Sequence, residues 1–332
     1  MNPVDARLGE IAGDWRAWMR TAVLPFWRAH GRDPATDLFR ERLDLDGRPD
    51  ATAPLRVRTQ ARQVHVFAQA QRLGLEPAGL EIARPGLLAL RSRAWAPDGR
   101  PGWVHVLDAT GAVSDSRRDA YDHAFILLML ATCLQAGGAA DVRAWIDTTL
   151  AEYDRLFATG HGGYAETAAG GLPRRQNPHM HLFEAFLALF EATGEPRFLA
   201  RAGALFGLFR TRFFDDATGV LREFFAADWG LLPNGGSDHV EPGHMVEWVW
   251  LLRRYAAHVD EPVDDLCARL LATAKRLGQT SAAAGFLVDA TDLDGAPVSD
   301  SRRLWPQTEF LKALVVEARA RADMGLADEA AM

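Results

Sequence analysis

The side chains best suited to acid–base chemistry lie in two short segments of this sequence. One holds Asn177, His181 and Glu184, and the other holds His244 and Glu247. Residues three, four or seven positions apart share one face of an α-helix, so each set would line a single helix face. Because histidine exchanges protons near neutral pH, we predict that His244 and His181 form the reactive part of a site.

Three further segments carry polar and aromatic side chains that suit a sugar. Arg58 opens one predicted helix, and Tyr121 opens another, where we prefer it to His123 because residues two apart point in different directions. Trp305 and Glu309 share a face of a third helix, in which an indole ring would stack on a sugar. The predicted substrate-binding residues are Arg58, Tyr121, Asn177, Glu184, Trp305, Gln307 and Glu309.

Structural roles compete with these assignments. A lone histidine such as His181 is more often a core residue with satisfied hydrogen bonds. Arg58 would equally serve as an ion-pair partner of Glu247 or Glu309, and Trp305 as a packing residue. Four other histidines fall in predicted loops or outer helices, where we expect them to be exposed. They are His30, His105, His161 and His258.

The pair His179 and His181 resembles a His-x-His metal motif. On a helix, however, residues two positions apart diverge, and helical metal pairs use a spacing of three or four. We therefore predict no metal and no cofactor. No dinucleotide-binding loop, P-loop or reactive cysteine is evident, and Cys133 and Cys267 lie in helical patterns as expected for buried thiols.

The clusters recur at an almost even spacing. Their first residues, Arg58, Tyr121, His181, His244 and Trp305, lie 63, 60, 63 and 61 positions apart. This period suits a pair of helices with long connecting loops. Each cluster opens an apolar helical segment, and we expect these inner helices to start near residues 57, 121, 177, 241 and 303. More amphipathic outer helices are predicted over residues 78–91, 141–157, 197–213 and 263–277, and an earlier helix over 15–29 should kink or end at Pro25.

This alternation predicts an all-α fold, an (α/α)6 toroid, formed by a single domain over residues 1–332. Long loops at one end of such a barrel usually build its active-site mouth. By the same period, a sixth inner helix should begin at roughly residue 367. The last helical hairpin is thus expected to be missing from this chain.

Composition narrows the class of protein. The chain has 332 residues, of which 48% are hydrophobic, enough for a large core. Its net charge of −7 argues against non-specific nucleic-acid binding, which needs a basic face. With no apolar run long enough for a membrane span and no signal-peptide pattern at the start, we expect a cytoplasmic protein that binds no membrane. The oligomeric state stays open, with a homo-oligomer as one alternative.

Four stretches resemble the N-acylglucosamine 2-epimerase superfamily of sugar epimerases and isomerases. The resemblance implies an (α/α)6 barrel and metal-independent exchange at C1 and C2 of a small-molecule sugar. It implies His244 as a catalytic acid–base, with His181 and Glu247 lining the sugar site, and we predict that these two are catalytic as well. It also implies a second family histidine that would follow residue 332, so the activity of the chain as written is in question. The four stretches are residues 58–62, 175–185, 241–248 and 305–309.

Within that superfamily, residues 302–309 resemble the mannose isomerases and their phosphomannose-isomerase relatives. We expect interconversion of mannose and fructose through a cis-enediol, with mannose-6-phosphate isomerase or sugar 2-epimerase activity as alternatives. A neutral hexose is favoured, although paired arginines precede two motifs. Other classes remain open: an α-toroid polysaccharide lyase, a glycosidase using Glu247 and Glu309, or a non-catalytic toroid. The arginines are Arg174, Arg175, Arg302 and Arg303.

Overall fold

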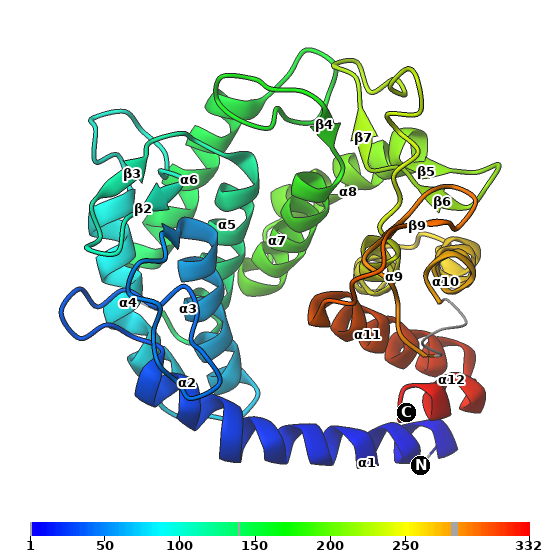
Figure 1. Ribbon diagram of the computed structural model, residues 1–332, viewed down its shortest axis with the longest axis horizontal. Coiled ribbons are helices and arrows are strands. Elements are labelled where there is room, and N and C mark those ends of the chain that lie inside the picture. Colours follow the sequence, from blue (N-terminus) through cyan, green and yellow to red (C-terminus); the bar gives the residue numbers. More distant parts are fainter. Residues whose placement is uncertain (1, 139, 280–284) are drawn as a thin grey trace. The chain divides into compact units, whose positions relative to one another are not determined.

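Two alternating series of helices make up most of the regular structure (Figure 1). The computed structural model describes residues 2–138, 140–279 and 285–332. The helices that carry the five clusters are α3 (Val57–Arg72), α5 (Ala120–Gln135), α7 (Asn177–Thr193), α9 (Pro242–Ala256) and α11 (Leu304–Arg321). Each begins within a few residues of its predicted start, because the hydrophobic period of a helix is visible in sequence.

The second series follows each of these helices along the chain. It corresponds closely to the predicted outer helices, although α8 ends early and continues as a π-helical turn, η2 (Phe209–Phe213). Its members are α4 (Gly79–Ala94), α6 (Ala140–Phe157), α8 (Pro196–Leu208), α10 (Asp264–Gly278) and α12 (Met324–Glu329).

The N-terminal helical region is longer than predicted. Helix α1 begins at Pro3 and runs to Trp18, followed by a π-helical turn, η1 (Met19–Val23), and by α2 (Leu24–His30). The regular α-helix over residues 15–29 is interrupted by η1 just before Pro25, in line with the prediction that Pro25 kinks or ends a helix there. Pro25 itself occupies the first turn of α2.

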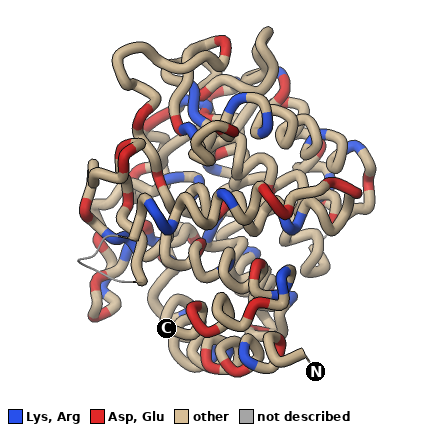
Figure 2. The backbone as a smooth tube through the Cα atoms, turned by 90° about the vertical axis from the view of Figure 1, so that its right-hand side faces the viewer, with Lys and Arg blue, Asp and Glu red and all other residues tan. Residues whose placement is uncertain are grey.

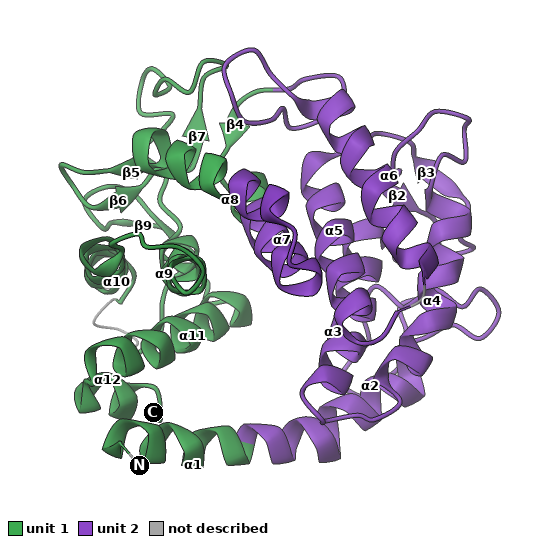
Figure 3. Cartoon of the chain, turned by 180° about the vertical axis from the view of Figure 1, so that it is seen from behind, with its two compact units in different colours: residues 1–14, 172–180, 203–332 green, residues 15–171, 181–202 purple. Residues whose placement is uncertain are grey.

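Contacts group the chain into two compact units (Figure 3). Unit 1 comprises residues 1–14, 172–180 and 203–332, and unit 2 comprises residues 15–171 and 181–202. Three of the four boundaries fall within α1, α7 and α8, and the fourth falls in the loop between residues 171 and 172. The single domain expected from the sequence stays a prediction.

Unit 2 is organised around α5. This helix packs against α3 and α6, and α3 also packs against α4. Residues from Ala124 to Ala131 are all buried, as expected for a helix covered on all sides. His123 points into this core, where its Nε2 atom accepts the Trp103 backbone N–H at 3.0 Å. Burial lowers the pKa of His123 to about 4, so this histidine is a neutral core residue.

Unit 1 is organised around α9. This helix packs against α10 and α11, and α11 packs against α12. Trp248 on α9 is fully buried and lies 4.4 Å from the ring of Phe209. At the beginning of the chain, Arg7 on α1 forms an ion pair of 3.1 Å with Asp328 on α12. An exposed pair of this kind contributes little to stability. Both of its residues belong to unit 1.

Short antiparallel strands occupy the connections before the cluster-bearing helices. The first group is a three-stranded sheet of β1, β2 and β3, and the other pairs are β4 with β7, β5 with β6, and β8 with β9. These strands fix the long loops beside the helix starts. Their bounds are β1 (Leu55–Arg56), β2 (Val106–Leu107), β3 (Val113–Asp115), β4 (Arg174–Arg175), β5 (Phe214–Asp215), β6 (Val220–Leu221), β7 (Phe224–Phe225), β8 (Ala290–Thr291) and β9 (Pro297–Ser299).

Acidic and basic residues are interspersed along the same elements (Figure 2). Among the described residues, no helix has the length and apolar character needed to cross a bilayer. Cys133 and Cys267 are both buried free thiols, as predicted. Burial raises the pKa of each to about 12, so neither is a reactive thiolate near neutral pH.

Candidate active site

His244 is the centre of the polar group that unit 1 contributes. It lies in the first turn of α9, and only 4% of its surface is exposed. Its Nδ1 atom lies 3.1 Å from both carboxylate oxygens of Glu223 and 3.7 Å from Glu241. Its Nε2 atom lies 3.1 Å from the amide nitrogen of Asn177. We call these four residues the His244 cluster: Asn177, Glu223, Glu241 and His244.

Local backbone structure explains how Glu223 reaches His244. Strand β7 pairs with β4 immediately before α7, so Glu223 lies beside the start of that helix. The Gln176 side chain donates a hydrogen bond of 3.0 Å to Glu223, and Gln176 accepts one of 2.9 Å from Trp248 on α9. A buried carboxylate must be bonded in this way to be stable. Glu223 is therefore fixed as a partner for the imidazole.

The charge of His244 follows from these neighbours. Burial by itself would lower the pKa of His244, because it disfavours the charged form. The nearby carboxylates of Glu223, Glu241 and Glu247 outweigh that effect and raise the pKa of His244 to about 9. His244 is thus an imidazolium at neutral pH. In that state Nε2 carries a proton, and rotation of the Asn177 amide would present its oxygen as the acceptor.

One buried side-chain atom in the His244 cluster lacks a hydrogen-bond partner among the described residues. The Asn177 side-chain oxygen is buried, and it makes no hydrogen bond to any part of the chain that the structure describes. Buried polar atoms are nearly always bonded, so an orphaned oxygen beside an acid–base histidine is a position for a ligand hydroxyl or for the imidazolium N–H.

Trp305 forms an aromatic wall beside His244. The two ring centroids lie 5.0 Å apart with an interplanar angle of 37°. Glycine at position 243 permits this approach, because a Cβ atom there would lie 2.6 Å from the Trp305 ring. Trp305 is half-buried, so part of the indole stays available for a sugar face.

The remaining predicted residues of unit 1 have protein partners. Glu247 is buried one turn after His244 on α9. Gln307 makes hydrogen bonds of 2.9 Å to both the N–H and the carbonyl of Leu287, so it anchors a loop. Glu309 accepts a hydrogen bond of 2.7 Å from Trp250 and pairs with Lys312 at 2.5 Å. Side chains engaged in this way have less capacity to bind a substrate.

In unit 2, His181 lies among aromatic rings. Its imidazole centroid is 5.1 Å from that of Tyr121 and 4.5 Å from that of Phe125. Its Nδ1 atom lies 3.5 Å from Glu184, one turn later on α7. Arg62 donates a long hydrogen bond of 3.4 Å to the Tyr121 hydroxyl. The structure therefore brings Tyr121 on α5 beside His181 and Glu184, which share a face of α7.

His179 differs from its neighbour His181. Its ring contacts Phe213 and Trp229, and its Nδ1–H donates to the Arg175 carbonyl at 3.0 Å. Burial lowers its pKa to about 4. His179 is a neutral core residue, which agrees with the expectation that the two imidazoles diverge.

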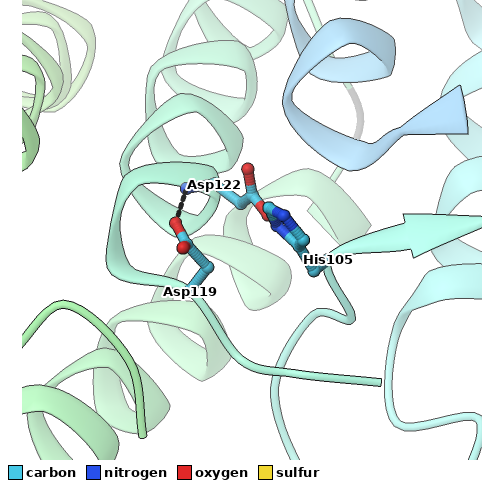
Figure 4. A group of neighbouring side chains, drawn as sticks. All are labelled: His105, Asp119 and Asp122. Carbon is cyan, nitrogen blue, oxygen red and sulfur yellow. Dashed lines mark hydrogen bonds and ion pairs between the residues drawn. The ribbon is translucent and has the colours of Figure 1, made fainter. Parts of the chain in front are cut away.

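Arg58 has a different partner from those considered in the sequence. Its guanidinium pairs with Asp122 at 3.1 Å, whereas the sequence suggested Glu247 or Glu309. The other oxygen of Asp122 lies 2.5 Å from Nδ1 of His105 (Figure 4). His105 was expected to be exposed, and that prediction was wrong: only 12% of its side chain is accessible. The hydrogen bond to the buried Asp122 carboxylate keeps the His105 side chain in this position.

Sequence reasoning missed Glu223, Asp122 and His105 as members of these groups. Glu223 and His105 lie in loop and strand segments with no helical period, so no spacing rule connects them to a helix face. Asp122 lies within the cluster around Tyr121, but an acidic residue in the first turn of a helix usually serves the helix terminus. One signal could have indicated Glu223: a charged histidine buried at the start of a helix requires a carboxylate partner, and an acidic residue in a nearby loop can supply it.

Comparison with known proteins identifies similar chains. Residues 38–332 match the family model described as N-acylglucosamine 2-epimerase (GlcNAc 2-epimerase). A mannose-6-phosphate isomerase of Rhizobium meliloti (strain 1021) is 36% identical over 325 residues, which cover 94% of this chain and 80% of the relative. A D-mannose isomerase of Thermobifida fusca is 32% identical over 303 residues, covering 85% of this chain and 73% of the relative.

Solved structures share the fold. A cellobiose 2-epimerase from Spirochaeta thermophila DSM 6192 superposes with a TM-score of 0.87 at 24% identity, covering 99% of this chain and 85% of that one. A D-mannose isomerase also reaches 0.87, at 23% identity and with coverage of 96% and 84%. A GH76 α-mannanase of Bacteroides thetaiotaomicron reaches 0.67 at 11% identity, covering 98% and 84%. These likenesses confirm the predicted all-α fold class of the (α/α) toroid.

Proposed function

Because this chain belongs to the N-acylglucosamine 2-epimerase family of sugar epimerases and isomerases, we propose that it interconverts mannose and fructose by proton transfer between C1 and C2. The names of its similar relatives, mannose-6-phosphate isomerase and D-mannose isomerase, favour aldose–ketose exchange. The single observation that carries the chemistry is the buried His244, held at Nδ1 by Glu223 and charged at neutral pH.

The protonation state of His244 suggests the order of steps. As an imidazolium, His244 first donates its Nε2 proton to the ring oxygen while the anomeric hydroxyl releases its proton to solvent, and the sugar ring opens to the aldehyde. The neutral imidazole then removes the C2 proton, giving a cis-enediolate. The O2 hydroxyl proton moves to O1, and His244 returns its proton to C1, which leaves the ketone at C2. On ring closure the C5 hydroxyl gives its proton back to His244, and the new anomeric oxygen takes one from solvent. Glu223 stabilises the charged form each time it is regenerated. A single histidine can thus serve as acid and then as base.

The other predicted residues are assigned to sugar binding and charge stabilisation. Arg58 suits the carbonyl oxygen, where negative charge develops as the enediol forms. Trp305 offers a ring for stacking, and Asn177 and Tyr121 offer polar atoms for hydroxyl groups. We keep His181, Glu184, Glu247 and Glu309 in the proposed site. Gln307 contributes indirectly, because it anchors the loop that contains Leu287.

Electrostatics favour a neutral hexose over a phosphorylated one. Carboxylates of Glu223, Glu241 and Glu247 surround His244. Three of the four arginines that suggested a phosphate site make hydrogen bonds within the protein. Arg303 donates to Asp289 at 2.7 Å, Arg174 to the Ala227 carbonyl at 2.8 Å and Arg302 to the Asp300 carbonyl at 2.8 Å. A phosphate would need unpaired cations to offset its charge.

The proposal predicts conversion of mannose to fructose with a clear preference for the unphosphorylated sugar. Incubation of the purified chain with mannose, with fructose and with mannose 6-phosphate, followed by sugar chromatography, checks this. Exclusive turnover of mannose 6-phosphate would reverse the substrate assignment, and conversion of mannose to glucose would establish 2-epimerase activity. An unsaturated or hydrolysed product from a polysaccharide would identify a lyase or a glycosidase.

Turnover should also be insensitive to chelators, since histidine chemistry supplies every proton transfer in the proposed reaction. We expect the same rate before and after dialysis against EDTA. A loss of rate that zinc or another divalent cation restores would contradict the metal-independent mechanism. Magnesium and zinc are added back separately, so that a general ionic effect is distinguished from a specific one.

A further inference from the structure

Asp122 is a buried carboxylate that serves two cationic or proton-donating partners at once. We propose that Asp122 is a positioning residue, which orients Arg58 and His105 through its two oxygens. It thereby holds the Arg58 guanidinium in the orientation that stabilises negative charge on the carbonyl oxygen of the sugar. This inference rests on the proposed function for the role of Arg58. We call these three residues the Asp122 cluster: Arg58, His105 and Asp122.

Each carboxylate oxygen of Asp122 binds a different side chain of the Asp122 cluster. The Oδ1 atom of Asp122 accepts a hydrogen bond of 3.1 Å from Nη1 of Arg58. The Oδ2 atom lies 2.5 Å from Nδ1 of His105, which therefore donates its proton in this direction. All three residues belong to unit 2. The Asp122 carboxylate thus orients two side chains that come from different segments of the chain.

The first turn of α5 makes this position rigid. Asp119 caps the helix by accepting the backbone N–H of Asp122 at 3.2 Å (Figure 4). The Asp122 side chain has no exposed surface. A carboxylate without access to water is costly unless it is paired, so Arg58 and His105 compensate for its burial. The positive end of the helix dipole adds to that compensation.

Arg58 depends on Asp122 for its orientation. Within residues 2–138, 140–279 and 285–332, Asp122 is the side chain found to hydrogen-bond the Arg58 guanidinium. The guanidinium carbon also lies 5.7 Å from the centroid of the Tyr121 ring. A long arginine side chain with 21% exposure samples several rotamers unless a partner fixes it. The pairing therefore selects the conformer that faces Tyr121.

A metal site is the alternative for this position. The ligand atoms of His105, Asp119 and Asp122 lie within 4.8 Å of one another. However, Arg58 and His105 already occupy the two oxygens of Asp122, and the guanidinium supplies the positive charge that a metal would bring. The geometry is that of a positioning carboxylate rather than of a ligand set.

Rescue by free guanidinium tests the inference. We expect Arg58→Ala to lower kcat/KM about 100-fold or more, as expected for loss of an electrostatic group at the reacting oxygen. Millimolar guanidinium chloride should restore part of that rate, because Asp122 still binds the ion in the vacated space. The double variant Arg58→Ala with Asp122→Asn should show no rescue. Asp122→Asn by itself should lower kcat/KM about 10-fold or more.

Two further variants keep the test interpretable. Asp119→Asn removes a carboxylate three residues away but preserves a good helix cap, so it should keep nearly the normal rate. Asp122→Glu retains the charge at a longer reach, and it should fold while losing rate to a similar degree as Asp122→Asn. Circular dichroism and thermal melting confirm that each variant is folded.

The possible outcomes separate this inference from the proposed function. If Arg58→Ala keeps its full rate, the role of Arg58 in the proposed function fails. If Arg58→Ala is impaired while Asp122→Asn or Asp122→Glu works normally, the positioning role of Asp122 is overturned. Equal rescue of the single and the double variant would overturn it as well, because guanidinium would then bind without the carboxylate.

Discussion

Replacing His244 with alanine should abolish the exchange of the C2 proton with solvent. The reason is that His244 is the buried imidazole which the proposed reaction uses first as an acid and then as a base. General acid–base catalysis typically contributes 10²- to 10⁴-fold, so we expect kcat to fall by about 1,000-fold. Nuclear magnetic resonance of mannose in heavy water measures the loss of the C2 proton signal directly.

His161 supplies the control for the His244 variant. It is an exposed histidine in the connection after α6, and His161→Ala should exchange the C2 proton at the normal rate. Both variants should elute from gel filtration and melt as the unmodified protein does. Undiminished deuterium uptake by a folded His244→Ala protein would show that another base removes the proton.

Replacing Glu223 with glutamine should lower the rate and move its pH dependence. Carboxylates beside His244 outweigh the effect of burial and raise the pKa to about 9, so the active form is the imidazolium. Without the Glu223 charge, the pKa of His244 should fall by about one to two pH units, corresponding to the 1.5–3 kcal/mol of a charged hydrogen bond. The alkaline limb of kcat/KM should shift to lower pH by that amount, so that kcat/KM at pH 8 falls about 2- to 10-fold.

The stability of the folded protein should also fall as the pH rises, because folding raises the pKa of His244. A histidine whose pKa rises from 6.5 to about 9 on folding contributes stability that is complete below pH 6.5 and is lost as the pH rises through 9. Glu223→Gln should therefore flatten the decline of the melting temperature between pH 6.5 and 9. Glu223→Asp retains the charge and should recover part of both effects. An unchanged pH profile in a folded Glu223→Gln protein would contradict the assigned role of Glu223.

The sequence by itself determined the helical framework. An apolar period of 3.6 residues is a local property, so the starts of α3, α5, α7, α9 and α11 were predictable to within a few residues. The recurrence of polar clusters at a period near 60 residues added the repeat architecture. The spacing of His179 and His181 was enough to predict that their imidazoles diverge.

The partners of the reactive groups were decided by the tertiary structure. Glu223 reaches His244 because β4 and β7 pair beside the start of α7, and no local pattern reports that pairing. Asp122 reaches Arg58 because α3 packs against α5.

The pKa values were also beyond the reach of sequence. Both His179 and His244 lie near helix starts in similar motifs, yet burial among aromatic rings lowers the pKa of one to about 4, and buried carboxylates raise the pKa of the other to about 9. A proton affinity depends on the charges and solvent around a group in three dimensions. Helix periodicity identified where acid–base residues stand, and long-range packing determined which of them carries a proton at neutral pH.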